Sequence, residues 1–266
     1  NIPLWKFFGA KEAKTINLYW SMGHGHKMNN REMLDLIVKG QKKGFNAFKI
    51  RMDWHEYNQD KDPEKDILMA KNVRDQVGEN TSLGFDANAG YSADCAISQS
   101  KKLSELNIKH FEEPVNTKNL LALKKVIEEA SVPISFGEYE KTFLRFTEIV
   151  ELTGLEILQP DILNIGGLTQ LKYLYDYSLK NDLKIMPHSP DVGILSFASL
   201  HIYSTIDSYD PHEYSDELCA RDDNIVQEYF NEEVLPKNGQ ITLTNKPGIG
   251  LSINKKIISN TEIKYD

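Results

Sequence analysis

The sequence contains little cysteine and no long apolar run. Only Cys95 and Cys219 occur, with no Cys-x-x-Cys pair, so neither a disulfide scaffold nor a zinc ribbon is indicated. No apolar run approaches the roughly 18 residues that a membrane span needs, and no secretory signal is visible. These absences make a cytoplasmic protein without membrane contact the default expectation.

Positive charge is also scarce. The chain has 31 Lys and Arg against 39 Asp and Glu, which gives a formal net charge of -8. A nucleic-acid surface usually needs a basic stripe, so this balance argues against a nucleic-acid partner. With 40% hydrophobic and 26% charged residues, the composition is that of an ordinary globular protein with ample material for a core.

Short apolar, β-rich runs alternate regularly with helical patterns along the chain. Strands are expected at 16–21, 45–50, 83–86, 108–111, 132–136, 155–158, 183–186 and 209–214. Helices are expected at 32–43, 63–77, 92–106, 117–130, 142–152, 167–180 and 192–203. Asn30 is the expected cap of the first of these helices.

This alternation implies an α/β fold with a parallel sheet and right-handed crossovers. Eight strands and seven helices favour closure into a (β/α)7β-type TIM-like barrel over residues 1–225. An open doubly wound sheet is the alternative, but it usually carries a G-x-G-x-x-G turn after its first strand. The first turn here reads Gly23-His24-Gly25-His26 and lacks that spacing. Residues 226–266 do not form another strand-helix unit.

One ionisable residue stands at the end of each of five successive strands. Subtracting residue numbers gives gaps of 26, 26, 23 and 27 for the series Asp86, Glu112, Glu138, Asp161 and His188. In a parallel α/β barrel, side chains at the carboxyl ends of the strands converge on one mouth, where active sites lie. A single acid at such a place often faces solvent or caps the next helix, but a series in register indicates a functional site.

The three carboxylates of this series come from consecutive strands. Asp86, Glu112 and Glu138 would repel one another strongly unless a cation lay between them. Ligand sets made only of oxygen select a hard ion such as Mg²⁺. The sequence therefore predicts a magnesium site formed by these three residues.

The remaining polar strand ends carry a base and two cations. Asp161 and His188 lie on neighbouring strands, and a carboxylate beside an imidazole fixes its tautomer and raises its pKa. Lys49 and Arg51 are two residues apart on the second strand, so both point to the same face. We expect these cations to lie opposite the carboxylates across the barrel mouth.

As a set, these motifs resemble the enolase superfamily, in its mandelate racemase/muconate lactonizing enzyme group. The resemblance covers about residues 1–225 and rests on Lys49-x-Arg51 where the family has Lys-x-Lys, Asp86 with Asn88, Glu112-Glu113-Pro114, Gly137-Glu138, Gln159-Pro160-Asp161, Pro187-His188 and Glu213. It implies that residues 226–266 normally complete an N-terminal α+β capping domain, which is absent from this sequence. It also implies a homo-oligomer.

The resemblance assigns roles to the site residues. The three acids would hold Mg²⁺, which binds the carboxylate of a small-molecule substrate. Lys49 would assist electrostatically, and His188, oriented by Asp161, would act as general acid or base. Glu213 would hydrogen-bond a substrate carboxylate oxygen. Asn88, on the same face as Asp86, is an expected substrate contact. Apart from the resemblance, the position of His24 in the first strand-end loop makes it a second expected substrate contact.

Arg51 departs from the family pattern, in which a second Lys serves as a base on the opposite face of the substrate. An arginine cannot easily serve as that base, because it gives up its proton only above about pH 12. Racemisation needs a base on each face of the substrate, whereas a dehydratase needs only one. The expected reaction is therefore dehydration of a sugar acid to a 2-keto-3-deoxy acid. The alternatives are a racemase or epimerase of a 2-hydroxy acid, a metal-binding barrel fragment with little turnover, and a lyase or aldolase that uses Lys49 as a Schiff base.

Overall fold

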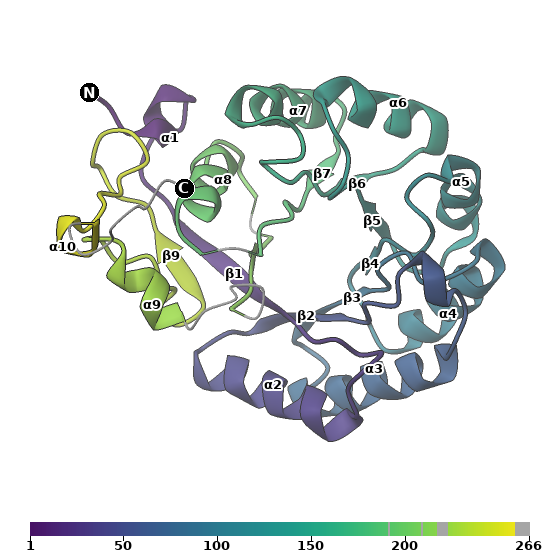
Figure 1. Ribbon diagram of the computed structural model, residues 1–266. Helices are drawn as coiled ribbons and strands as arrows, with labels where there is room; N and C mark the ends of the chain where they lie inside the picture. The colour runs from purple at the N-terminus through teal and green to yellow at the C-terminus, as the bar shows by residue number, and fades with distance from the viewer. Residues whose placement is uncertain (191, 209, 217–222, 259–266) are drawn as a thin grey trace, which may run out of the picture.

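The computed structural model describes residues 1–190, 192–208, 210–216 and 223–258. Its central element is a ring of parallel strands (Figure 1). The strands are β1 (Thr15–Met22), β2 (Ala47–Arg51), β3 (Ser82–Asp86), β4 (Phe111–Glu112), β5 (Ile134–Phe136), β6 (Ile157–Leu158), β7 (Lys184–Ile185) and β8 (His212–Tyr214). They pair in the order β7-β6-β5-β4-β3-β2-β1-β8.

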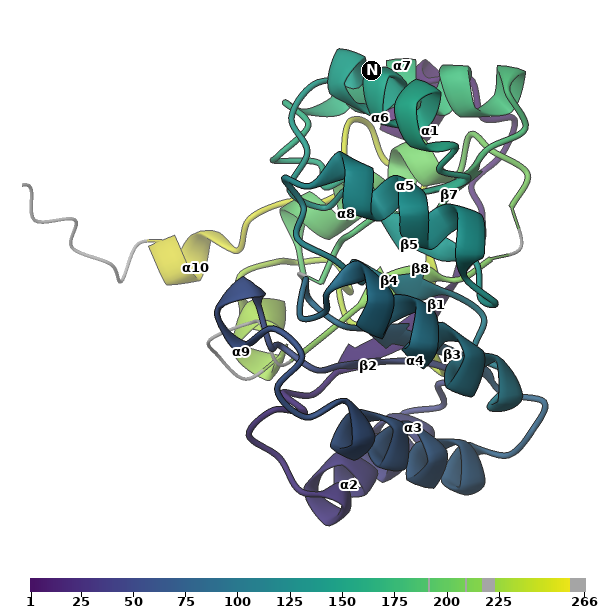
Figure 2. The ribbon, with the colours of Figure 1, turned by 90° about the vertical axis from the view of Figure 1, so that its right-hand side faces the viewer.

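Helices surround this ring and connect each strand to the next (Figure 1). The connecting helices are α2 (Asn30–Lys42), α3 (Pro63–Val77), α4 (Ala93–Glu105), α5 (Leu120–Glu129), α6 (Phe143–Thr153), α7 (Leu168–Lys180) and α8 (Ile194–Tyr203). The remaining elements are α1 (Leu4–Phe7), the 3-10 turn η1 (Glu56–Asn58), α9 (Asp223–Glu228), β9 (Gln240–Thr242) and α10 (Lys255–Ile258). Figure 2, turned by 90°, shows α9 and α10 on the same side of the barrel.

The predicted barrel is confirmed, with eight parallel strands and the connecting helices α2 to α8. The predicted cap of α2 was wrong by one residue. Asn29 accepts hydrogen bonds from the backbone N–H groups of Arg31 and Glu32, and the Glu32 carboxylate bonds back to the Asn29 N–H. This reciprocal capping box explains why Asn29 rather than Asn30 caps the helix. The strand expected over 209–214 is present as β8, and residue 209 lies outside the described residues.

The C-terminal segment returns to the first strand. β9 pairs antiparallel with β1, with Ile241 opposite Ile16. The N-terminal α1 packs on α8, where the Trp5 N–H donates to Nδ1 of His201 at 3.1 Å. The indole N–H of Trp5 also donates to the carbonyl of Thr244 at 2.9 Å. Both ends of the described chain therefore contact the β8-β1 side of the barrel.

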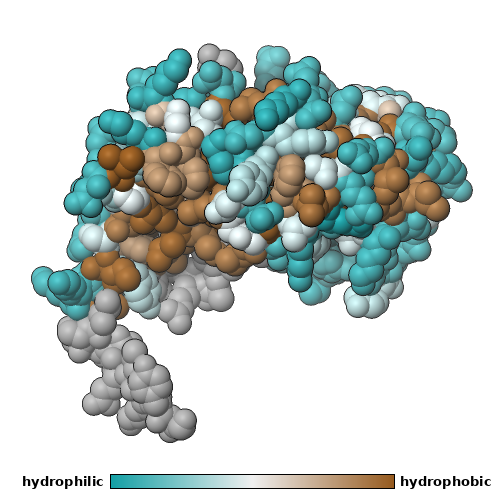
Figure 3. Space-filling model, turned by 90° about the horizontal axis from the view of Figure 1, so that it is seen from above, coloured by the Kyte–Doolittle hydropathy of each residue, from teal (hydrophilic) through white to brown (hydrophobic). Residues whose placement is uncertain are grey.

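Apolar residues gather on one side of the molecule, near the C-terminal segment (Figure 3). A groove of about 400 Å³ in this region is lined by Val192, Ile194, Leu195, Val226, Tyr229, Phe230 and Ile253. Its residues come from the start of α8, from α9 and from the chain that follows. Among the described helices, none combines the length and hydrophobicity that a bilayer crossing requires.

Candidate active site

The three predicted metal ligands meet at the carboxyl ends of β3, β4 and β5. Parallel pairing places Asp86 opposite Glu112, and Glu112 opposite Ser135 of β5. Glu138 lies three residues beyond Ser135, after Gly137, whose φ of 126° turns the chain at the end of the strand. One carboxylate oxygen from each of Asp86, Glu112 and Glu138 lies within 4.8 Å of the other two, and all three residues are buried.

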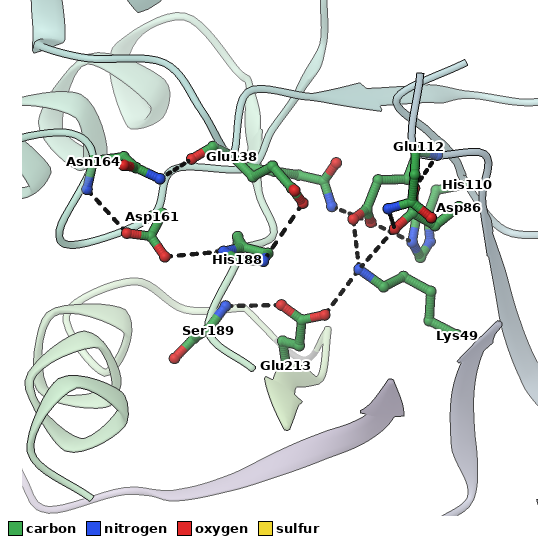
Figure 4. Close-up of polar contacts among 12 residues, drawn as sticks. Lys49, Asp86, His110, Glu112, Glu138, Asp161, Asn164, His188, Ser189 and Glu213 are labelled. Atoms are coloured by element: carbon green, nitrogen blue, oxygen red, sulfur yellow. Dashed lines mark hydrogen bonds and ion pairs between the residues drawn. The ribbon is translucent and has the colours of Figure 1, made fainter. Parts of the chain in front are cut away.

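Lys49 lies beside this cluster and touches acids from three strands (Figure 4). Its Nζ is 2.5 Å from Oε1 of Glu112, 2.8 Å from Oε1 of Glu213 and 4.0 Å from Oδ2 of Asp86. All of these side chains are at most 2% exposed. In such a site, a charged group remains ionised only when an opposite charge compensates its lost hydration.

The acids in this cluster respond differently to their surroundings. Burial is the largest influence on Glu112 and Glu213 and opposes ionisation of both acids, but Lys49 with His110 lowers the pKa of Glu112, and Lys49 with His188 lowers that of Glu213 to about 2. Burial and the neighbouring Glu112 raise the pKa of Asp86 well above its usual value. Burial likewise raises the pKa of Glu138. One ammonium group therefore compensates only part of the acidic cluster.

The residues present fit a divalent cation. The donor set consists only of carboxylate oxygens, as Mg²⁺ prefers. Glu113, which follows Glu112 in the sequence, is a further acid at this place. Its Oε1 is buried and has no hydrogen-bond partner among the described residues. Burial, with Glu138 next in effect, raises the pKa of Glu113 well above its usual value. The triad formed by Asp86, Glu112 and Glu138 can therefore hold a metal ion that offsets this concentration of negative charge.

Lys49 is poorly suited to Schiff-base chemistry. Burial opposes its charged form, but Glu112 and Glu213 outweigh burial and raise the pKa of Lys49 well above its usual value. A lysine attacks a carbonyl as the neutral amine. This environment favours the ammonium ion and an electrostatic role.

The predicted His188–Asp161 pair forms at the ends of β6 and β7. These residues are joined by an isolated parallel bridge beyond the two strands. Nδ1 of His188 lies 2.9 Å from Oδ2 of Asp161. The other carboxylate oxygen, Oδ1, accepts from the backbone N–H groups of Leu163 at 2.8 Å and Asn164 at 3.0 Å. Asp161 is thereby held rigidly and orients the imidazole.

The second ring nitrogen of His188 faces the carboxylate triad (Figure 4). Nε2 lies 3.5 Å from Oε2 of Glu138. Burial opposes the charged imidazole, but Glu138, the hydrogen bond to Asp161 and Glu213 together raise the pKa of His188 to about 10. The acid-base nitrogen thus adjoins the candidate metal ligands, and a cation held there would offset the negative charge of Glu138 and lower the pKa of His188 toward the range in which the imidazole acts as a base.

The structure places the other predicted residues at the same mouth. Arg51 is 6% exposed and pairs in register with Asp86. Asn88 donates to Asp86 through its backbone N–H at 2.8 Å and its Nδ2 at 2.9 Å. Glu213 accepts the Ser189 N–H at 2.8 Å. His24 lies in the loop after β1, apart from the His188 pair.

Several polar residues of the site carried no role in the sequence prediction. Gln159 donates from Nε2 to Oε2 of Glu112 at 2.5 Å, and Asn164 donates from Nδ2 to the Glu138 carbonyl at 2.8 Å. Gln159 lies two residues before Asp161, and this spacing in an extended segment was the available signal. Asp53, which bonds to His24, lies two residues beyond Arg51. The same two-residue spacing was available for Asp53, but its positive φ of 53° takes the chain out of the extended conformation on which that spacing argument depends.

This barrel, with acids at the ends of its third, fourth and fifth strands, matches a known family. The sequence profile of the Enolase C-terminal domain-like family matches residues 32–257. The chain therefore belongs to this family, and the predicted membership of the enolase superfamily is confirmed.

Relatives and solved structures agree with this assignment. Arabinonate dehydratase from Saccharolobus solfataricus is 27% identical over 98% of this chain and 67% of its own length. D-galactarolactone cycloisomerase from Agrobacterium fabrum is 25% identical over 84% of this chain and 58% of its own length. A mandelate racemase/muconate lactonizing protein from Paracoccus denitrificans, solved in complex with magnesium, superimposes with a TM-score of 0.90 at 27% identity, covering 97% of this chain and 69% of that one.

Proposed function

We propose that this protein catalyses the Mg²⁺-dependent dehydration of a sugar acid to a 2-keto-3-deoxy acid. The observation that carries the proposal is the position of His188, which is held by Asp161 and lies 3.5 Å from the triad residue Glu138. This arrangement would place a base beside a substrate whose carboxylate is held at the triad. The relatives named arabinonate dehydratase and D-xylonate dehydratase support the same reaction class.

The reaction would begin at the carbon next to the substrate carboxylate. His188 would take the proton from C2 through Nε2, while Asp161 keeps the ring oriented through Nδ1. A magnesium ion held by Asp86, Glu112 and Glu138 would supply Lewis-acid stabilisation of the charge that develops on the carboxylate oxygens. Lys49, already a buried ammonium, would add a fixed positive charge at the same place.

Other residues would contact the substrate from the rim of the site. Glu213 has a pKa of about 2 and is ionised, so it would hold the Lys49 ammonium toward the substrate carboxylate rather than donate a hydrogen bond to that carboxylate itself. Asn88 and His24 lie at the ends of β3 and β1, where the hydroxyl groups of the substrate would project. Loss of the C3 hydroxyl as water then gives an enol, which becomes the 2-keto acid.

Arg51 separates dehydration from racemisation. A racemase must remove a proton from one face of C2 and return one to the other face. A guanidinium ion does not exchange protons near neutral pH, since it deprotonates only above about pH 12. Arg51 therefore supports elimination, which does not require a second base at C2.

A substrate panel tests this proposal. The purified protein with Mg²⁺ is mixed with aldonic and aldaric acids, beginning with arabinonate and xylonate, and 2-keto products are measured. We expect turnover of at least one acid and a loss of roughly a hundredfold or more in the His188→Asn variant. Absence of keto acid across the panel, or racemisation of a 2-hydroxy acid, would contradict the proposal.

A second candidate function is a metal-binding barrel with little turnover by itself. The apolar groove beside α8 and α9 favours it, because such a surface is usually covered by another domain or partner. The chain also spans only 58% to 67% of the length of the relatives described above. Metal titration with a turnover assay separates the two functions, since tight Mg²⁺ binding without activity would favour the second.

A further inference from the structure

A second histidine-carboxylate pair lies at the rim of the barrel mouth. His24 stands two residues beyond the end of β1, and Asp53 stands two residues beyond the end of β2. Nδ1 of His24 is bonded to Oδ2 of Asp53. The two loops are joined beyond the strands, because the Gly25 N–H donates to the Arg51 carbonyl at 3.0 Å. The pair is therefore built on the same strand end as Arg51.

Hydrogen bonds connect this pair to the triad. The Asp53 N–H donates to Oδ1 of Asn88 at 2.7 Å, and Nδ2 of Asn88 donates to Oδ2 of Asp86 at 2.9 Å. Asp53 and Asn88 have φ values of 53° and 49°, in the left-handed region that residues other than glycine rarely occupy. Such conformations persist where surrounding contacts hold them, and they cluster at functional sites.

The His24 pair repeats the arrangement of the His188 pair. In each, Nδ1 meets a carboxylate, which leaves Nε2 as the nitrogen that can exchange a proton with a substrate. The His24 side chain is 41% exposed, and its Nε2 has no hydrogen bond to any residue in the described part of the chain. In Figure 1, β2 lies across the ring from β7, so the two pairs approach the mouth from different sides.

We propose that His24, oriented by Asp53, is the general acid that protonates the departing C3 hydroxyl. This inference rests on the proposed dehydration. His188 takes the C2 proton, the resulting electron pair forms the C2=C3 bond, and the C3–O bond breaks. The hydroxyl leaves as water with the Nε2 proton of His24. The enol product then gains a proton at C3 from His188 and loses its hydroxyl proton to His24, which restores both imidazoles.

Proton exchange in heavy water separates this role from simple substrate binding. Without the acid, the enediolate would form at His188 but would not eliminate, and it would recover a deuteron at C2. In the His24→Asn variant we expect dehydration to fall roughly a hundredfold or more, while C2–H exchange persists within about threefold of the rate of proton removal in the wild type. His188→Asn should lose both reactions.

His26→Asn is the matched control. His26 lies in the same loop, but its Nδ1 bonds to the Met52 carbonyl at 3.0 Å and its ring packs 5.7 Å from that of Trp54. This control should leave both reactions within about threefold of wild type. Asp53→Asn should lower dehydration more than exchange, because it disturbs the orientation of His24 without removing the imidazole.

The outcomes are distinguishable. Unchanged dehydration in His24→Asn, or equal loss of dehydration and exchange, would overturn the assignment of His24 while leaving the proposed function intact. A second variant, His24→Gln, with circular dichroism and Mg²⁺ titration of both proteins, separates these results from misfolding. A wild-type protein inert toward all sugar acids would instead overturn the proposed function, and this inference with it.

Discussion

Replacing the buried acid Asp66 by asparagine should stabilise the protein at neutral pH. Asp66 lies in the first turn of α3 and is 1% exposed. Its carboxylate accepts the Trp54 indole N–H at 2.8 and 3.0 Å and the Tyr91 hydroxyl at 2.5 Å. Trp54 directly follows Asp53, so this acid anchors the loop that orients His24.

The magnitude and sign follow from the pKa of Asp66. Burial outweighs the hydrogen bonds from Tyr91 and Trp54 and raises this pKa from 3.8 to about 6. The unfolded chain therefore ionises at lower pH than the folded protein. The stability that the neutral carboxyl provides is complete below about pH 4 and is lost as the pH rises through about 6. A shift of about two units corresponds to about 3 kcal/mol.

Asp66→Asn keeps the shape of the side chain and removes its ionisation. Its amide oxygen can accept from Trp54, and its NH₂ can donate to the Tyr91 hydroxyl. The free energy of unfolding of Asp66→Asn minus that of the wild type should therefore grow by up to about 3 kcal/mol between about pH 4 and about pH 7. Contributions from other titrating groups cancel in this difference.

Urea unfolding monitored by circular dichroism, with a chelator present, measures this difference at several pH values. Asp75→Asn is the control, because Asp75 is an exposed acid on the same helix. The difference measured for Asp66→Asn is read relative to this control. A difference for Asp66→Asn that is flat with pH, or that shrinks as the pH rises, would refute the reasoning.

Three further changes test the site. Asp161→Asn should lower kcat roughly a hundredfold or more with little change in KM, measured by steady-state kinetics, because His188 loses its orienting carboxylate. Glu112→Gln should weaken Mg²⁺ binding at least about tenfold by calorimetry. Gly84→Ala should lower the free energy of unfolding in urea by about 1–3 kcal/mol, because the added Cβ would overlap the His110 ring. The Mg²⁺ affinity of this variant should also fall, because Nε2 of His110 lies 3.6 Å from Oε2 of Glu112.

The spacing of the strand ends along the sequence predicted that Asp86 and Glu112 lie together, because parallel pairing places the ends of neighbouring strands side by side. Asp86 and Glu112 end adjacent strands and pair directly, so equal spacing along the sequence became adjacency in space. Glu138 does not follow from register alone, since it lies beyond the paired residue Ser135 and depends on the turn at Gly137. A carboxylate next to a glycine still marked the end of a strand, so the place of Glu138 in the cluster followed from the sequence, while its role as a metal ligand stays a prediction.

Element boundaries depended on contacts that the sequence pattern does not specify. Two adjacent asparagines precede α2, and either suits a cap, but only Asn29 stands three residues before Glu32 and completes the capping box. The helix expected from residue 117 begins as α5 at Leu120, where Asn119 accepts the Ala122 N–H at 3.0 Å. Both differences reflect competition among neighbouring polar residues for the same backbone donors.

The pairing of His24 with Asp53 could not be predicted from the spacing of the strand ends. Asp53 continues the alternation of Lys49 and Arg51, so an extended chain would direct all three to the mouth. The left-handed backbone at Asp53 depends instead on the Asn88 hydrogen bond from the next strand. An arginine at position 51 keeps the positive charge of the usual lysine but supplies no exchangeable proton near neutral pH. Arg51 on β2 would then supply only positive charge, and His24 in the loop after β1 would transfer the proton on this side of the mouth. Loop conformation is not fixed by a repeating sequence pattern, so the partner of His24 could not be identified from the sequence.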